Sequence, residues 1–182
     1  MTRPSDITPE EIDEAQEIWC DRLIKISRAY MERETRGDDE YRDLARAFVD
    51  EMYDNWETRQ VFFRPTLALA PQNFRTTRAG ALAYLIGENL EEFPRDKGFI
   101  KLNWIRARHD NLVEGKRAIQ THGTIGIAMG HVFLTPEIST DGKDTVVDKI
   151  FVYKKYGEHD LRLIVHNSAA TNLPGEVSED EQ

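Results

Sequence analysis

The chain has 182 residues, of which 33 are acidic and 24 are basic, so its formal net charge is −9. This length suits one ordinary domain with its own core. The composition, with 40% hydrophobic and 31% charged residues, is typical of a soluble globular protein. Charges or glycines interrupt every long apolar stretch, which excludes a transmembrane helix. The first six residues lack the basic and then apolar order of a secretory signal, so we expect a cytoplasmic protein.

The distribution of charge and the single cysteine exclude two further classes of function. Residues 1–60 carry a net charge of −8, residues 61–175 one of +3, and the last seven residues one of −4. Without a dense stripe of lysine and arginine we expect no nucleic-acid partner. Cys20 has no second cysteine to pair with and no Cys/His cluster beside it, so we expect neither a disulfide nor a zinc site.

Helical patterns dominate the first half of the chain. Thr8 to Glu11 combine a threonine cap, a proline and a glutamate at the positions that start a helix. Apolar residues at three- and four-residue steps, bounded by caps and glycines, predict three helices, over residues 8–34, 38–56 and 78–86. The segment 61–70, between the second and third helix, predicts an irregular strand or an extended loop that enters the core.

From Phe99 onward the apolar period changes to two, which is typical of strands. Four β-rich runs are expected, over residues 99–110, 119–134, 145–156 and 161–169. Helices followed by a meander of strands predict an α+β domain, in which a curved antiparallel sheet wraps the long first helix. Glycines at 123, 126 and 130 would allow the bends that this curvature needs. We expect a flexible segment 1–7, one domain over residues 8–174, and a disordered acidic tail over 175–182.

The five histidines, at positions 109, 122, 131, 159 and 166, show no HxH or HExxH spacing, so no metal site is expected. His166 stands out because strand alternation places it with Ser168, Ile164 and Arg162 on one face, and Asn167 on the other. Such a pair can orient a water molecule. On these residues alone, a core histidine bonded to a neighbouring hydroxyl is the simpler interpretation. A Ser-His-Asp nucleophile is less attractive because no GxSxG elbow is present.

Several short strings in this order resemble the iota-class carbonic anhydrases. Arg64-Pro65-Thr66-Leu67-Ala68 is similar to the family's Lys-Pro-Thr-Leu-Ala, and His166-Asn-Ser-Ala169 stands where the family typically reads His-His-Ser-Ser. The strings between them are Phe74-Arg75, Gly80-Ala-Leu-Ala-Tyr-Leu-Ile-Gly87 and Asp96-Lys-Gly-Phe99. The resemblance covers roughly residues 60–173. It implies a cystatin-like cone, as in the association domain of calcium/calmodulin-dependent kinase II and in polyketide-cyclase-like proteins.

The resemblance also implies a catalytic pocket of Thr66, Tyr84, His166 and Ser168 that hydrates carbon dioxide to bicarbonate without a metal or other cofactor. The three hydroxyls would hold the water and bicarbonate oxygens. His166 would orient Ser168 or relay a proton, since an unperturbed histidine pKa near 6.5 suits that work. The family's second histidine and second serine are replaced by Asn167 and Ala169, both expected on the face away from the pocket.

Two other functions fit the same fold, because a fold does not determine chemistry. One is a non-catalytic, dimerising module that binds a small anion. The other is a polyketide-cyclase-like isomerase or hydrolase that acts on a larger apolar ligand. An exposed sheet face would also suit a homodimer of the enzyme.

Overall fold

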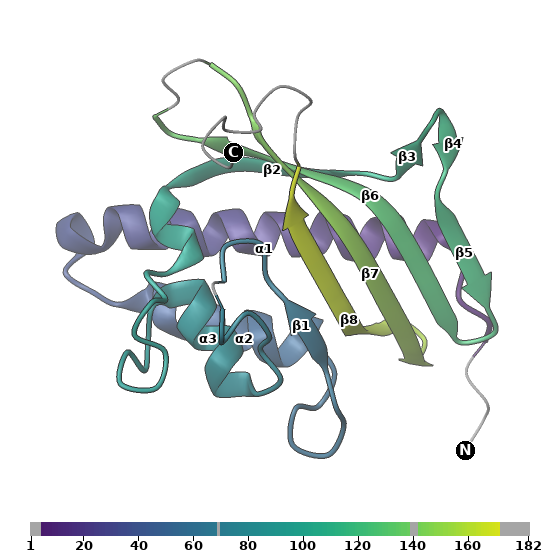
Figure 1. Cartoon of the computed structure of the whole chain (residues 1–182), viewed down its shortest axis with the longest axis horizontal. Coiled ribbons are helices and arrows are strands. Elements are labelled where there is room, and N and C mark those ends of the chain that lie inside the picture. The colour runs from purple at the N-terminus through teal and green to yellow at the C-terminus, as the bar shows by residue number, and fades with distance from the viewer. Residues whose placement is uncertain (1–4, 69, 139–141, 172–182) are drawn as a thin grey trace, which may run out of the picture.

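The computed structural model describes residues 5–68, 70–138 and 142–171 (Figure 1). Its helices are α1 (Pro9–Arg36), α2 (Glu40–Met52), α3 (Arg78–Ile86) and the short 3₁₀ helix η1 (Phe99–Leu102). Its strands are β1 (Phe62–Arg64), β2 (Trp104–Asp110), β3 (Leu112–Val113), β4 (Lys116–Arg117), β5 (Ile119–His122), β6 (Ile125–Pro136), β7 (Thr145–Gly157) and β8 (Asp160–Ala170). This order confirms the predicted α+β class. The predicted acidic tail lies outside the described residues.

Capping residues set the ends of α1 and α3 where the sequence predicts them. The Thr8 side chain accepts a hydrogen bond from the Glu11 amide at 3.3 Å, and the Glu11 carboxylate accepts one from the Thr8 amide at 2.9 Å. Gly37, at a φ of 70°, ends α1 at Arg36, two residues beyond the predicted end. The Thr77 hydroxyl and Gly87 bound α3 in the same way.

The prediction that the second helix continues to Trp56 is wrong. α2 ends at Met52, and Tyr53 is extended, with φ of −103° and ψ of 160°. The backbone leaves the helix here because Tyr53 forms a parallel β-bridge with Leu163, and the amide of Asp54 donates to the Leu163 carbonyl at 3.0 Å. This long-range pairing turns the Tyr53 side chain into the core.

The strands form one six-stranded sheet, in which the order β1-β8-β7-β6-β2 is completed by β5 alongside β6. All neighbouring pairs are antiparallel except β1 and β8, which are parallel, so the predicted antiparallel sheet of the second half of the chain is confirmed and β1 adds a parallel edge strand to it. Figure 1 shows α1 lying across the strands of this sheet, with α2 and α3 grouped beside β1. The short β3 and β4 pair only with each other.

Two of the predicted strands are divided. The run 99–110 begins as η1, and β2 starts only at Trp104. The run 119–134 is a hairpin, in which Gly123 at a φ of 59° occupies the turn between β5 and β6. Gly126 lies within β6, where a Cβ atom would stand 2.5 Å from Cδ1 of Ile12. The absence of a side chain there lets α1 approach the sheet.

A bulge in β8 changes the predicted faces of this strand. Tyr153 pairs with Leu163 and Val152 pairs with Val165, so Ile164 is an additional residue on β8. Leu163 is therefore fully buried on the same side as His166, and the prediction that Ile164 and Arg162 share the His166 face is wrong. Beyond the bulge, alternation holds as predicted through His166 and Ser168.

Packing begins before the predicted domain start. Ile7 is buried, and its amide donates to the Gly123 carbonyl at 2.8 Å, so residue 7 already packs against the sheet. One cluster of buried apolar side chains extends from Ile7 to Leu163 and includes residues from α1, α2, α3 and the sheet. No helix in the described part of the chain is long and apolar enough to cross a membrane.

Candidate active site

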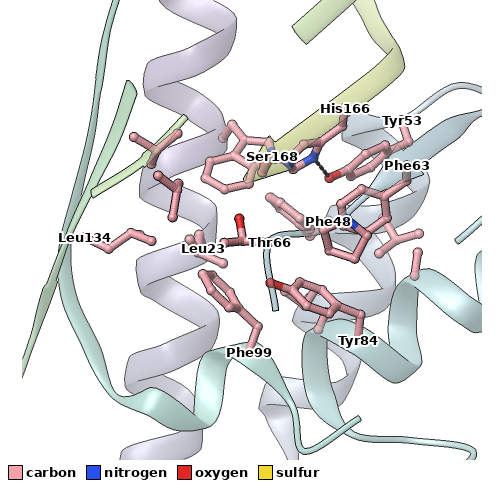
Figure 2. A pocket seen from close by; sticks show the side chains of 17 residues that line it. Leu23, Phe48, Tyr53, Phe63, Thr66, Tyr84, Phe99, Leu134, His166 and Ser168 are labelled. Atoms are coloured by element: carbon pink, nitrogen blue, oxygen red, sulfur yellow. Dashed lines mark hydrogen bonds between the residues drawn. The ribbon is translucent and has the colours of Figure 1, made fainter. Parts of the chain in front are cut away.

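A small cavity lies between α1, α2, α3 and the inner face of the sheet (Figure 2). The space open to the centres of water molecules is ≈ 40 Å³, and most of the side chains around it are apolar, among them Leu23 and Leu134. The four candidate residues from the sequence all line this cavity: Thr66, Tyr84, His166 and Ser168. The fold therefore brings together side chains from three distant segments of the chain.

The parallel pairing of β1 with β8 joins the first and last of these segments. Phe63 is in register with His166, and Arg64 is in register with Asn167. The Arg64 guanidinium also donates to the backbone carbonyl of Ser168 at 2.8 Å. Because Thr66 follows two residues after β1, this pairing places its hydroxyl beside the cavity, where Figure 2 shows it among the polar groups.

His166 is bonded through both ring nitrogens. Its Nδ1 lies 2.7 Å from the hydroxyl of Tyr53, and its Nε2 lies 2.7 Å from the hydroxyl of Ser168. Burial, with a smaller contribution from the charge of Lys149, lowers the pKa of His166 to about 3. The imidazole is therefore neutral at physiological pH and much less basic than the unperturbed histidine on which the expected proton relay was based.

Tyr53 is the functional candidate that the sequence analysis missed. It lies beside the cavity, is buried, and is the only described residue other than Ser168 that bonds the His166 ring. It lies within the predicted second helix, next to the apolar stripe, which gave it the pattern of a core aromatic residue. The signal that was available is chemical, because a buried tyrosine hydroxyl usually needs a hydrogen-bond partner.

Tyr84 enters the cavity from α3. Its ring stacks on Phe99 with 5.4 Å between centroids and meets Phe63 edge-on at 5.7 Å, which holds the hydroxyl toward the cavity (Figure 2). Burial raises the pKa of Tyr84 far above its usual value, although the backbone amide of Leu67 acts in the opposite direction. The hydroxyl therefore stays protonated and is available as a hydrogen-bond donor.

A buried ion pair links two of the strings on which the family resemblance rests. The Arg75 guanidinium donates to both carboxylate oxygens of Asp96, at 2.7 and 2.9 Å, and both side chains are at most 5% exposed. The Arg75 amide also donates to the carbonyl of Phe63 at 2.7 Å. A Cβ on Gly80 would stand 3.0 Å from Cδ of Arg75, so this glycine leaves room for the pair. The pair holds the loops beside Thr66 and Phe99.

The two departures from the family motif lie away from the cavity. Asn167 and Ala169 are partly exposed, whereas His166 and Ser168, which alternate with them along β8, are buried. Asn167 is in register with Ile150 of β7 and Arg64 of β1. Neither departure removes a side chain from the cavity wall.

The other four histidines are scattered. His109 is partly buried beside Trp19, whereas His122 and His159 are exposed, and Nε2 of His131 lies 3.5 Å from a carboxylate oxygen of Asp148 on the outer side of the sheet. Within the described ranges, no three residues of the types His, Cys, Asp and Glu come together as a possible metal site. The cavity thus offers hydroxyls and one neutral imidazole as its polar groups.

Comparison with known proteins gives consistent results. The model of the family "metal-independent carbonic anhydrase" matches residues 10–170. A metal-independent carbonic anhydrase from Nostoc sp. (strain PCC 7120) is 37% identical over 163 residues, which cover 90% of this chain and 73% of that protein. The crystal structure of a cyanobacterial iota-carbonic anhydrase complexed with bicarbonate superimposes with a TM-score of 0.80 at 34% identity, covering 95% of this chain and 98% of that one.

Proposed function

Because the chain belongs to the family of metal-independent carbonic anhydrases, we propose that its cavity is where carbon dioxide is hydrated to bicarbonate. The observation that carries this assignment is the convergence of Thr66, Tyr84, His166 and Ser168 on one small space. Three of the four are hydroxyl groups, which suit oxygen atoms of water, carbon dioxide and bicarbonate. The similar cyanobacterial structure is a complex with bicarbonate, which supports the same class of ligand here.

The size of the cavity supports a small substrate. One water needs roughly 10–15 Å³ of this kind of space, so ≈ 40 Å³ holds about three water-sized groups. That is enough for carbon dioxide and the attacking water. A polyketide-like ligand would need a much larger pocket, which disfavours the isomerase or hydrolase alternative. A small-anion-binding module fits the same space, and only an activity measurement separates it from the enzyme.

In the reaction, the water oxygen forms a bond to carbon, one carbon–oxygen π bond opens onto oxygen, and one proton leaves to solvent. Negative charge develops on the former carbon dioxide oxygens. Hydroxyl donors that already point at these positions stabilise that charge without reorganisation. We assign this role to Thr66, Tyr84 and Ser168, while the apolar wall holds carbon dioxide.

Ionisation of the site residues contributes little to this scheme. The low pKa of His166 keeps it from binding the released proton at neutral pH, and the high pKa of Tyr84 keeps its proton in place. We therefore expect that protonation of His166 does not change the catalytic rate between mildly acidic and neutral pH. His166 orients Ser168 instead.

The test is a pH-indicator assay of carbon dioxide hydration on purified protein. The protein is first dialysed against a strong chelator, and elemental analysis confirms the loss of metal. We expect hydration to persist, because the described polar groups of the cavity are hydroxyls and an imidazole. Activity that disappears and returns with zinc would refute the metal-free mechanism, and a wild type with no activity would favour the anion-binding module.

We also propose a homodimer formed through the outer face of the sheet, and a reducing, cytoplasmic setting. Exposed apolar side chains on adjacent strands support the first: Met129 and Ile150 are register partners, 43% and 38% exposed. The buried free thiol of Cys20 supports the second. Sedimentation of the wild type and of a Met129→Lys, Ile150→Lys variant would test the dimer.

A further inference from the structure

The hydrogen bonds around His166 form a chain that has a direction. Tyr53, His166 and Ser168 are all at most 6% exposed, so solvent does not complete their hydrogen bonds. The His166 ring is neutral, because burial opposes its charged form. A neutral imidazole carries one N–H and one bare nitrogen, so one of its two hydroxyl neighbours must donate to it and the other must accept.

Tyr53 is the neighbour whose direction is restricted by its surroundings. The Trp19 indole N–H is buried and has no hydrogen-bond partner of normal geometry among the described residues. It lies close enough to the Tyr53 oxygen to lower the pKa of this phenol against the larger, opposite effect of burial. An indole N–H can only donate. A donor near the Tyr53 oxygen favours the arrangement in which the phenol directs its own proton elsewhere, toward an acceptor.

The Nδ1 atom of His166, at 2.7 Å, is the acceptor at hydrogen-bond distance from Tyr53 in the described part of the chain. In the opposite arrangement, Nδ1–H would donate to a tyrosine oxygen that also faces Trp19, and the phenolic proton would be buried without a partner. Leaving a buried donor unsatisfied is strongly unfavourable. The arrangement with Tyr53 as donor gives the buried phenolic proton a partner and leaves the Ser168 proton free to point into the cavity.

We propose that Tyr53, oriented by Trp19, holds His166 as the Nε2–H tautomer, so that Ser168 receives a hydrogen bond from the imidazole and turns its own proton toward the ligand. The part that concerns the ligand rests on the proposed function. Ser168 is then a donor to the oxygens of carbon dioxide and bicarbonate, and neither a nucleophile nor a base activated by His166. Tyr53 and Trp19 are positioning residues, because they act through His166.

Nuclear magnetic resonance of protein labelled with ¹⁵N-histidine tests the tautomer directly. Two-bond proton–nitrogen correlations distinguish a protonated from a bare ring nitrogen, and the signals lost in His166→Gln identify the residue. We expect Nε2 protonated and Nδ1 bare, with no change from mildly acidic to mildly alkaline pH. A wild-type His166 that carries its proton on Nδ1, or on both nitrogens, would overturn the proposal.

The variant Tyr53→Phe removes the hydroxyl that bonds Nδ1 and, with it, the oxygen beside Trp19, and Tyr153→Phe is its matched control. Tyr153 is also fully buried in the core, but its hydroxyl has no partner among the described residues. We expect Tyr53→Phe to give signals of both His166 tautomers and to lower the hydration rate by ~10–100-fold, as loss of a supporting partner typically does. Tyr153→Phe should change neither. A pure Nε2–H tautomer in Tyr53→Phe would show that Tyr53 does not hold it.

The proposed tautomer and the proposed activity can be refuted independently of each other. If the wild type shows the Nε2–H tautomer but hydrates no carbon dioxide, the proposed function is wrong and the orientation of His166 stands. If the wild type is active and the tautomer is reversed, the function stands and Ser168 presents an oxygen lone pair to the ligand. If Tyr53→Phe does not fold, the wild-type spectrum still decides the direction of the chain.

Discussion

Two histidines that pack against the same tryptophan, one buried and one partly buried, have different hydrogen-bond partners. His166 and His109 both pack edge-on against Trp19, at 5.9 and 5.5 Å, and both contact the ring of Phe151. Burial lowers the pKa of each, so both rings are neutral. His166 has a hydroxyl at each nitrogen and lines the cavity, whereas Nε2 of His109 is buried with no described partner.

The region around His109 is dominated by a buried lysine. Lys149 points inward from β7, is 2% exposed, and its ammonium contacts Nδ1 of His109. It forms no ion pair with a carboxylate in the described residues, although the charges of Asp13 and Asp110 favour its protonated form. The contrast teaches that burial, with a smaller contribution from the charge of Lys149, makes both histidines neutral, and that the partners of the ring decide whether it is oriented for use. Lys149 is in register with Ser168, so the two regions meet on adjacent strands.

The two regions should differ most in how substitutions affect the hydration rate, and the largest loss is expected for substitutions in the cavity. Ser168→Ala and Tyr84→Phe each remove one hydroxyl and add no bulk. Loss of one preorganised donor typically costs ~3–4 kcal/mol of transition-state stabilisation, so we expect hydration rates ~10²–10³-fold lower, with unchanged circular dichroism. Steady-state hydration of each variant is the measurement. Wild-type rates in both would show that the reaction takes place elsewhere.

In the His109 region, we expect Lys149→Met to change stability and not activity. Burial lowers the pKa of Lys149 to about 7 in the folded chain, against about 10.4 when unfolded. Between these values the unfolded state binds more protons, so stability rises with pH, and below pH 7 the full cost of the buried charge is present. Above about pH 8.5 the buried Cys20 thiol opposes the rise, because its pKa is raised to about 12.

The usable window is therefore pH 7 to about 8.5, where the wild type should gain roughly 2 kcal/mol of unfolding free energy. Lys149→Met should lack this gain and be the more stable protein at pH 6. Guanidinium titrations of both proteins at several pH values give the difference, in which groups that do not interact with Lys149 cancel. Equal pH dependence in the two proteins would show that Lys149 does not titrate with a lowered pKa in the folded protein. A hydration rate that fell as far as in Ser168→Ala would show that Lys149 also takes part in the activity.

The smallest effect is expected at Asn167. Its side chain lies on the face away from the cavity, between Ile150 and Arg64 in the sheet register. Asn167→Ala should change the activation free energy of hydration by less than ~1 kcal/mol, because the side chain does not reach the cavity. The assay is the one used for Ser168→Ala. A loss as large as that of Ser168→Ala would place the functional face of β8 on the outer side.

Local rules predicted the parts of this structure that local sequence determines. The capping box at Thr8 and the glycine after Ile86 bound α1 and α3 as expected, and alternation placed His166 and Ser168 together. The four cavity residues came from the family resemblance. Their actual proximity depends on the fold.

The predictions that failed depend on contacts between distant segments. α2 ends early because Tyr53 pairs with Leu163, and the faces of β8 shift because Ile164 bulges against β7. The role of Tyr53 was missed for the same reason. The pKa of His166 follows from burial under Trp19 and Phe151, which no spacing in the sequence expresses.

The parallel pairing of β1 with β8 has a consequence for the order of folding. The strands β6, β7 and β8 are consecutive hairpin partners, whose contacts close short loops, whereas Phe62 pairs with Val165 across most of the chain. Closing a longer loop costs more entropy, and contacts between distant segments slow folding, so we expect the hairpins to form before β1 docks. Thr66 would reach Ser168 only in that late step. A nascent or partly folded chain would then contain the His166–Ser168 pair and still lack a complete cavity.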